Sequence, residues 1–544
     1  MFSEAEKDLL KKYVTSVDDG IFAVKGMEGM VGAAYARYSR ARGGFREVLL
    51  NEFIKEGEID PKHADQLIER ILVAYGDDSV GELEGAHVSF ENISMLATKE
   101  IEDRRIGGSP IEQSTRYVFY DMKDDAGHWR YLRDPGFADA QLAKDYLATM
   151  DFIFETYASL VEPMKKYFGS LKTIEDAEYD INGDGTKEKL RDLIEEKDKK
   201  AFRITYNFDV RTKSCDTLRC LLPLSTLTNL GMFGNGRFYQ HLISHLFTSA
   251  IAEAGDIGKK TLIATSEVIP QYVRRAKRSD YLASVRSEMF ALASELFAAS
   301  EPEIPQQLPA IHLLDDLEVF DDQVVAAMLF PYLNLSLSSI RQRAGRLDRS
   351  AKQRIIDTYV NKRTNRRDRP GRALEEGYSN TFELVTNWGV YKDLMRHRMN
   401  TQQRQLFTTK LGFDLPLELK KAGFESQVLA CVKRADALFD QIASSDALLA
   451  QYAVLHGHYA RWTLSMNDRE AMHMLELRST PQGHPQYRRV VQEMHRLISA
   501  RSPWRGEAMK FADYNEYYWS RADSEARQRV EERILEEKFT KEIQ

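Results

Sequence analysis

Apolar positions recur with helical spacing along much of the chain, and short alternating runs separate these stretches. Residues 65–74 place apolar side chains three and four positions apart, which predicts an amphipathic helix. Residues 84–91 and 381–388 alternate between apolar and polar side chains, which predicts two strands. Each predicted strand runs into a helical pattern that ends near Arg104 or Arg396. We therefore expect an α+β fold in which a small sheet packs with several long helices.

The two predicted strands belong to a longer internal repeat. An offset of 292 residues aligns Glu84 with Glu376 and Arg104 with Arg396 without a gap. Farther along, an offset of 232 residues gives a second gapless window, which aligns Asn235, Arg237 and His241 with Asn467, Arg469 and His473. Two such windows in the same order indicate a duplication. Polar turn residues precede helical patterns at both Asn-x-Arg elements, so each is expected at a helix start.

The repeat divides the sequence into two predicted domains. The offset falls by about sixty residues between the windows, so the first copy carries an insertion near residues 120–200 that the second copy lacks. Residues 301–309 contain three prolines, which disfavour a helix and indicate a linker. The expected domains are a first copy over 1–300 and a second copy over 310–544.

Composition narrows the class of protein. Of the 544 residues, 43% are hydrophobic and 29% are charged, and the net charge is −7, which argues against a generally basic nucleic-acid-binding surface. Three cysteines cannot build a disulfide framework or a cysteine-ligated zinc site. The acidic N-terminus does not have the pattern of a signal peptide, and no run of consecutive apolar residues reaches about 18. We expect a cytoplasmic protein without a membrane span.

The densest cationic motif is Met395–Arg398 in the second copy, where two arginines flank a histidine. The planar guanidinium suits phosphate oxygens or the polar acceptors of a flavin. A solvated basic helix end would have the same sequence. The equivalent region of the first copy, 104–117, offers hydroxyls, backbone N–H groups and Arg116, which fits phosphate capture or an ordinary capped turn.

Taken together, these motifs resemble the flavin-dependent thymidylate synthases. The family pattern is an Arg-His-Arg triplet, then seven residues, then Ser with Arg-Tyr shortly after, and later Asn-x-Arg and a Leu-Arg pair. Residues 75–90, 112–117, 396–398 and 475–478 carry the resemblance, which covers most of both halves outside the insertion.

The two halves depart from the family pattern in complementary ways. The first half keeps the loop residues Glu112, Ser114, Arg116 and Tyr117, but its triplet reads Arg104-Arg105-Ile106. The second half keeps the triplet and Arg478, but Leu406 and Thr408 stand at the loop positions. Arg219 matches a nucleotide-binding arginine of the family, with Gln451 as its counterpart, and Leu246 is the counterpart of Arg478.

In the family, the site forms between subunits of a homotetramer. The resemblance therefore implies one mixed site, with the loop of the first copy and Arg396, Arg398 and Arg478 of the second, and one decayed reciprocal site. It also implies a homodimer of the two-copy chain in place of the tetramer. Gln451 counts against full retention of the nucleotide-binding arginines.

The implied reaction is reductive methylation of dUMP to dTMP, with methylenetetrahydrofolate, FAD and NADPH. The resemblance assigns Arg478 and Ser114 to catalysis and needs no cysteine nucleophile. Nucleotide binding falls to Ser114, Arg116, Arg219, Arg396 and Arg478. FAD binding falls to Glu112, Arg396, His397, Arg398, Asn467, Arg469, His473 and His484, with a second flavin subsite at Asn235, Arg237 and His241.

Other features leave two further functions open. The altered loop and Gln451 would permit a flavoenzyme acting at C5 of another pyrimidine nucleotide, or a decayed nucleotide-binding protein. Residues 341–372 hold twelve Lys/Arg against three Asp, which favours a solvated helix face over an RNA surface. Asp180–Gly185 copies half a calcium loop, but Arg191 at its twelfth position favours a charged turn. No metal site and no nucleic-acid partner are expected.

Overall fold

The computed structural model describes residues 2–27, 30–39, 41–55, 58–59, 78–296, 303–314, 321–333, 335–368, 370–519, 521, 525–532 and 534–535. The chain forms two compact units. The first unit comprises Met1–Gln113, Leu132–Phe137 and Ser225–Glu301, and the second comprises Ser114–Tyr131, Ala138–Leu224 and Pro302–Gln544. The second unit thus joins helices of the first sequence copy to the second copy. The boundaries of the copies themselves stay a prediction, because the units are defined by spatial contacts and not by the repeat.

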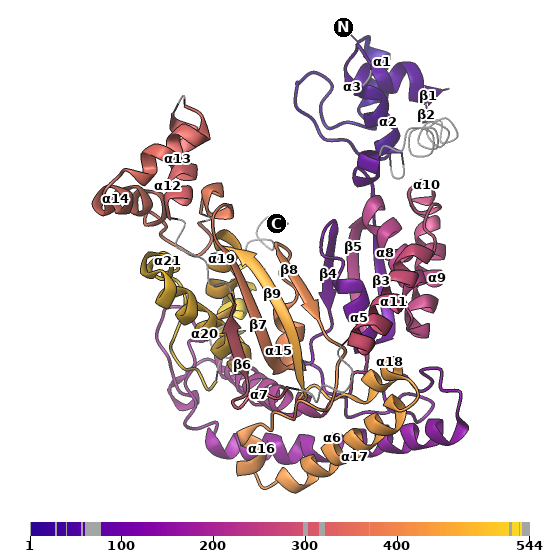
Figure 1. Cartoon of the computed structure of the whole chain (residues 1–544), viewed down its shortest axis with the longest axis vertical. Coiled ribbons are helices and arrows are strands. Elements are labelled where there is room, and N and C mark those ends of the chain that lie inside the picture. Colours follow the sequence, from indigo (N-terminus) through magenta and orange to yellow (C-terminus); the bar gives the residue numbers. More distant parts are fainter. Residues whose placement is uncertain are drawn as a thin grey trace. The chain divides into compact units, whose positions relative to one another are not determined.

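The first unit is built on a three-stranded antiparallel sheet in the order β3-β5-β4 (Figure 1). Its strands are β3 (Gly85–Ser94), β4 (Gly108–Glu112) and β5 (Leu227–Asn235). The strand predicted over 84–91 is therefore confirmed as β3. Its last residue, Ser94, caps α5 (Met95–Glu102) by accepting a hydrogen bond from the backbone N–H of Ala97. Helices α8 (Gly236–Thr248), α9 (Ala252–Ser266), α10 (Pro270–Val273) and α11 (Asp280–Leu296) complete the sheet-bearing part.

The N-terminal part of the first unit consists of short elements. They are α1 (Glu4–Leu10), α2 (Val31–Tyr38), α3 (Phe45–Val48), the π-helical turn η1 (Leu49–Phe53), β1 (Ile54–Lys55), β2 (Glu58–Ile59) and the 3-10 turn η3 (Asp78–Glu82). Helix α2 joins the rest of the unit where Glu84 accepts a hydrogen bond from the backbone N–H of Val31 at 2.5 Å. The helix predicted over 65–74 lies outside the described residues.

The second unit repeats the same sheet with one strand more. Its order is β6-β7-β9-β8, all antiparallel, with β6 (Ala310–Leu313), β7 (Ser379–Asn387), β8 (Asn400–Arg404) and β9 (Tyr459–Asn467). The strand predicted over 381–388 is confirmed as β7. The additional strand β6 pairs with the edge of β7 that corresponds to the open edge of β3 in the first unit. Helices α15 (Trp388–Leu394), α19 (Asp468–Arg478), α20 (Pro485–Arg501) and α21 (Pro503–Ala508) surround the sheet.

Long helices of both copies pack together in the second unit. Helix α6 (Ala140–Leu171) of the first copy lies along α17 (Glu425–Ala443) of the second and against α7 (Glu196–Leu218), as Figure 1 shows. The 3-10 turns η5 (Arg219–Leu221) and η8 (Gln451–Ala453) follow at equivalent positions. Beyond them, Pro223 forms an antiparallel bridge with Leu455, its own counterpart at the offset of 232. The two copies are therefore interleaved in the second unit.

The insertion forms a small core of its own. Tyr179 and Glu188 pair as an isolated antiparallel bridge, and buried Ala177, Tyr179, Ile181, Leu193 and Phe202 cluster against α7. The carboxylate of Asp180 accepts hydrogen bonds from the backbone N–H groups of Gly183 (2.7 Å) and Gly185 (3.0 Å). This exposed turn occupies the place of the half-matching calcium loop.

The basic stretch is mostly solvated, as predicted, with one exception. Exposed arginines lie on α13 (Leu337–Gly345), at its C-cap and on α14 (Arg349–Val360), at positions 341, 343, 346, 349 and 354. Arg363, in contrast, is only 7% exposed, and its Nη1 donates to Glu476 at 2.9 Å. Since a buried charge needs a partner, Arg363 belongs to the core and not to a surface for RNA.

The remaining elements are α12 (Asp321–Leu329), α16 (Leu417–Lys421), α18 (Ala447–Ala450), and the 3-10 turns η4 (Leu190–Asp192), η6 (Phe330–Tyr332) and η7 (Arg372–Glu375). Among the helices that the structure describes, none has the length and apolar character to cross a membrane.

Candidate functional site

A cavity of about 440 Å³ opens in the second unit between the end of α15 and one face of α19. Its lining includes six of the residues expected at the flavin site, together with Arg478. The full lining is Glu375, Arg396, His397, Arg398, Met399, Asn467, Arg469, Glu470, His473, Leu477 and Arg478. The Arg-His-Arg triplet and the Asn-x-Arg-x3-His element, seventy residues apart in the sequence, thus meet in one space.

Helix α19 presents its cavity residues on one face because of its cap and its periodicity. The side chain of Asn467 is the N-cap and accepts a hydrogen bond from the backbone N–H of Glu470 at 3.0 Å. Arg469 and His473 are four positions apart and therefore lie one above the other. Arg469 is held by Glu375 and by the carbonyl of Pro370, to which its Nε donates at 3.0 Å. The predicted helix start at Asn467 is confirmed.

A chain of three side chains fixes the protonation of His397. Its Nδ1 lies 2.8 Å from a carboxylate oxygen of Glu470, and its Nε2 lies 2.9 Å from Nε of Arg478. A carboxylate only accepts, so Nδ1 carries the proton, and Nε2 accepts from the arginine. His397 is thus a neutral imidazole that orients Arg478 along the cavity wall.

The loop of the first copy is held by a buried ion pair in the same unit. Nε and Nη2 of Arg116 each donate to the carboxylate of Asp216 at 2.6 Å, and Nη1 donates to the carbonyl of Gln482 at 3.2 Å. Burial disfavours the guanidinium, but the facing carboxylate of Asp216 outweighs it and raises the pKa of Arg116. Ser114 Oγ accepts from the backbone N–H of Arg116 at 3.2 Å. Arg116 stays charged and oriented.

Arg219 lies at the C-cap of α7, one turn after Asp216, and is 3% exposed. Its Nη1 donates to Asp393 at 3.2 Å. Its Nη2 is buried and has no hydrogen-bond partner among the described residues. A Cβ at Gly389 would come within 3.0 Å of Nη2, so the glycine leaves room for the guanidinium. The Nη2 group of Arg219 could therefore donate to a bound ligand.

Asp393 is the carboxylate around which the cations of both copies gather. Burial alone would raise its pKa, but Arg219, Arg116 and Arg396 outweigh burial, with a smaller contribution from His484, and the pKa lies below its ordinary value. The loop arginine, the α7 arginine and the triplet arginine are thus close enough to act on one carboxylate. Side chains of both copies therefore meet within the second unit, and their role as one composite site stays a prediction.

His484 and Tyr487 stand between the loop and the cavity. Burial, and then the charges of Arg219 and Arg116, lower the pKa of His484 well below its ordinary value. The neutral ring caps α20 by accepting from the backbone N–H of Gln486 at 3.2 Å. The guanidinium of Arg478 lies 5.9 Å from the ring centroid of Tyr487. These groups link the cavity to the arginine cluster, by which we mean Arg116, Arg219, Arg396 and Arg478.

Comparison with known proteins shows to which family the sequence belongs. The family described as thymidylate synthase complementing protein, the flavin-dependent thymidylate synthases, matches residues 26–271 and again 313–504. The chain belongs to this family. The two matched segments confirm the resemblance and the tandem duplication of its α+β domain.

Three relatives align with this chain over more than nine-tenths of its length. The UPF0159 protein of Chlamydia muridarum is 33% identical over 97% of this chain and 99% of its own, and that of Chlamydia pneumoniae is 34% identical over 97% and 98%. The UPF0159 protein of Thermoplasma acidophilum is 31% identical over 92% and 98%.

Solved structures of the UMP/dUMP methylase PolB from Streptomyces cacaoi also align with part of the chain. The complex with 5-Br dUMP has 17% identity and a TM-score of 0.28, and covers 38% of this chain and 97% of its own. The complex with 5-Br UMP has 16% identity and a TM-score of 0.30, and covers 39% and 98%. Alignments with TM-scores this low support no conclusion about this chain.

The first copy of the family domain has an equivalent cavity of about 510 Å³ in the first unit. Asn235 caps α8 there, as predicted, and Arg237 pairs with Glu82 at 2.7 Å beside His241. The hydrogen-bonded series of side chains that orients Arg478 has no equivalent here. Phe238, Arg105 and the fully buried Leu246 stand in place of Glu470, His397 and Arg478. Asn235, Arg237 and His241 thus line one cavity with fewer polar groups, and their role as a second flavin subsite stays a prediction.

The remaining counterparts are used for packing. Gln451, the counterpart of Arg219, is 1% exposed, and its Oε1 accepts from the backbone N–H of Phe407 at 3.1 Å between Leu406 and Thr408. Glu112 belongs to the first unit, where its buried carboxylate accepts from Lys99 at 3.2 Å. Its expected role at the flavin site stays a prediction.

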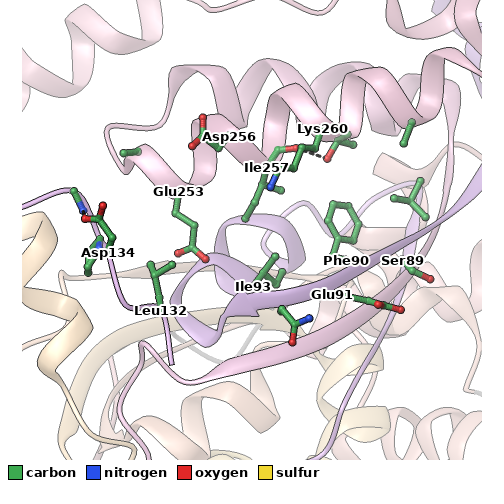
Figure 2. A pocket seen from close by; sticks show the side chains of 17 residues that line it. Ser89, Phe90, Glu91, Ile93, Leu132, Asp134, Glu253, Asp256, Ile257 and Lys260 are labelled. Carbon is green, nitrogen blue, oxygen red and sulfur yellow. Dashed lines mark hydrogen bonds between the residues drawn. The ribbon is translucent and has the colours of Figure 1, made fainter. Parts of the chain in front are cut away.

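A further cavity, in the first unit, is lined by none of the predicted site residues. About 580 Å³ lies along the open edge of β3, beneath α9. Figure 2 shows Glu91, Asp134, Glu253 and Asp256 around it, with Lys260 from α9. Glu253 is already engaged, since Ser94 donates to it through its backbone N–H (2.8 Å) and Oγ (2.6 Å). We therefore place the candidate site in the second unit.

Sequence reasoning missed the carboxylates and the tyrosine of the site. Asp216 and Asp393 lie three positions before Arg219 and Arg396, and each stands on a helix that ends just before or at a predicted arginine. That spacing is the signal that could have found them. No sequence signal marked Tyr487. Within the described residues, no group of three or more His, Cys, Asp and Glu side chains could hold a metal ion.

Proposed function

We propose that the chain is a flavin-dependent thymidylate synthase that methylates C5 of dUMP at one composite site. The observation that carries this proposal is the meeting of Arg116 and Arg219 from the first copy with Arg396 from the second copy around Asp393, in a member of this family. A nucleotide monophosphate is a dianion that carries polar acceptors on its base, and an arginine cluster suits both.

The cavity beside α19 supports flavin as the cofactor. Four arginines, two histidines and an asparagine line it, a donor set that suits a pyrophosphate and the oxygens and nitrogens of an isoalloxazine ring. Arg396, His397, Arg398, Asn467, Arg469 and His473 would hold FAD. When bound, FAD reduced by NADPH supplies the hydride, and methylenetetrahydrofolate supplies the carbon.

The protein's own part is binding, orientation and polarisation. Arg478, fixed by His397 and Glu470, would place a positive charge against the uracil and stabilise negative charge that develops there. The free Nη2 of Arg219 and the two N–H groups of Arg116 that have no partner among the described residues would bind the phosphate. Ser114 presents a hydroxyl beside Arg116. His484 would remain neutral near the flavin.

The cysteines support a mechanism without an enzyme thiolate. Cys215, Cys220 and Cys431 are the three cysteines of the sequence, and all are buried and reduced. Burial raises the pKa of each thiol, so none is ionised near neutral pH.

Tritium release tests the reaction directly. With NADPH, methylenetetrahydrofolate and dUMP labelled at C5, the purified protein should release tritium and form dTMP, and it should carry a flavin absorbance. No release from dUMP, with release from labelled UMP, would replace dUMP by another pyrimidine nucleotide. No release from either, together with a colourless protein, would leave a non-catalytic homologue.

Matched substitutions test the composite site. Arg478→Leu copies the decayed position Leu246, and Arg219→Gln copies Gln451, so each should weaken nucleotide binding by about tenfold or more. Arg237→Leu, at the first-copy cavity, is the control and should leave the affinity unchanged. Undiminished nucleotide binding in both Arg478→Leu and Arg219→Gln would contradict the composite site.

A further inference from the structure

A C-terminal strap, residues 513–519 and 521, follows α21 and lies beyond the second matched family segment, which ends at 504. One of its aromatic anchors is Tyr517, whose hydroxyl donates to Asp513 at 2.9 Å and whose ring lies 4.8 Å from the guanidinium of Arg488. Arg488 in turn donates to the carbonyl of Asn515 at 2.9 Å. The strap is therefore tied to α20 at its start.

The next two residues tie the strap to helices of the first copy. The ring of Tyr518 lies 3.9 Å from Nζ of Lys213 on α7. The ring of Trp519 lies 6.0 Å from that of Phe168 on α6 and 4.8 Å from Nζ of Lys172. Aromatic faces under ammonium groups hold the chain in place along these helices.

The anchored strap ends with a cation beside the loop of the composite site. The guanidinium of Arg521 lies 4.5 Å from the ring centroid of Tyr117, directly after Arg116. Its Nε is buried and has no hydrogen-bond partner among the described residues. Burial, and then the charge of Arg116, lower the pKa of Arg521 to about 9, while Glu525 acts weakly in the opposite direction. Two neighbouring cations, one without a hydrogen-bonded carboxylate, are unfavourable until an anion joins them.

We propose that Arg521 is a phosphate-binding residue of the composite site, which the C-terminal strap adds to the arginines of the family domain. The inference rests on the proposed function, and it identifies the 5′-phosphate of the pyrimidine nucleotide as the anion. The diphosphate of FAD offers the same chemistry, and the experiment distinguishes the two sources. Arg521 binds and positions; it takes no part in bond making.

The test compares Arg521→Gln with a matched control, Arg496→Gln, on α20. Arg496 also lies over a strap tyrosine, Tyr514, at 5.0 Å, but its side chain is 57% exposed and pairs with Glu493. Calorimetry with dUMP should show affinity about tenfold weaker in Arg521→Gln and unchanged in Arg496→Gln. Binding of deoxyuridine, which lacks the phosphate, and the flavin content should be the same in all three proteins.

Each other outcome decides against a stated claim. Equal dUMP affinity in wild type and Arg521→Gln overturns the inference, as does an equal loss for dUMP and deoxyuridine. Loss of flavin with retained dUMP affinity assigns Arg521 to FAD and also overturns it. Wild-type protein that binds no pyrimidine monophosphate overturns the proposed function itself. Because the substitution removes a repulsion, the melting temperature without ligand should not fall; a fall with unchanged dUMP affinity would make Arg521 structural.

Discussion

Neutral histidines next to arginines set the electrostatics of the candidate site at the scale of single residues. His397 accepts from Arg478 at Nε2 because its Nδ1–H donates to Glu470 on the other side, and His484 stays neutral because burial and two arginines oppose its charge. A positive histidine at either place would repel the arginines that the site needs for an anion. The local geometry thus keeps positive charge on guanidinium groups.

His484 makes stability depend on pH in a predictable direction. Its folded-state pKa lies below the ordinary value, so below about pH 6.5 the unfolded chain gains a proton that the folded chain does not. Stability is therefore lost as the pH falls, by up to about 1.4 kcal/mol per pH unit from this group. Above that pH the group contributes no dependence.

Melting temperatures at pH 7.5 and 5.5 check this expectation. His484→Asn keeps a good N-cap for α20 and should lose less stability on acidification than wild type. His312→Asn, at an exposed histidine of β6, should behave as wild type. A His484→Asn protein as acid-sensitive as wild type would show that His484 titrates normally.

At the scale of elements, the sequence predicted what local patterns determine. Alternation gave β3 and β7, and the polar residues at 235 and 467 gave the starts of α8 and α19, where both asparagines act as caps. The insertion and the linker, inferred from the change in offset and from three prolines, stay predictions. Strand alternation and helix caps depend on a few neighbouring residues, so one sequence is enough to find them.

What the sequence could not give depends on contacts between distant residues. Asp216 and Asp393 look like ordinary polar helix residues until they face arginines of other elements. Nothing local indicates that α6 and α7 of the first copy pack with α17 of the second, or that β6 covers the edge of β7. Arg363 appears in a basic run, and only its burial against Glu476 reveals a core residue.

The paired caps separate stability from function. Asn467→Ala and Asn235→Ala each remove one cap bond, of 3.0 Å and 2.8 Å, and each should lower the free energy of unfolding by about 1 kcal/mol. Only Asn467 lines the cavity of the second unit, so only Asn467→Ala should also lower flavin retention. Denaturant unfolding and flavin absorbance measure the two effects. Equal flavin loss in both variants would assign equal binding to both cavities.

At the scale of the whole molecule, the two copies of one domain differ in the polar side chains around their cavities. The second unit contains the polar chain Glu470–His397–Arg478, and the first unit has Phe238, Arg105 and Leu246 at those positions. The side chains around the two cavities thus differ in the direction that the resemblance implies, with one mixed site and one decayed reciprocal site.

This inequality predicts the stoichiometry of nucleotide binding. Titration calorimetry with dUMP should give about one nucleotide per chain, because the polar chain that orients an arginine exists in one copy. Arg478→Leu should weaken that single event by about tenfold or more. Two equivalent nucleotides per chain would contradict the decay of the reciprocal site.

The bridge between Pro223 and Leu455 has a consequence for how such a site can change over time. Equivalent positions of the two copies pair with each other there, so the interleaved helices are related by an approximate two-fold rotation. In an oligomer of identical subunits, one mutation alters every symmetry-related position at once. In the fused chain a mutation alters one position, so Leu246 or Gln451 can replace an arginine in one half while its counterpart is kept. Covalent fusion therefore allows the two halves of the molecule to acquire different side chains at equivalent positions.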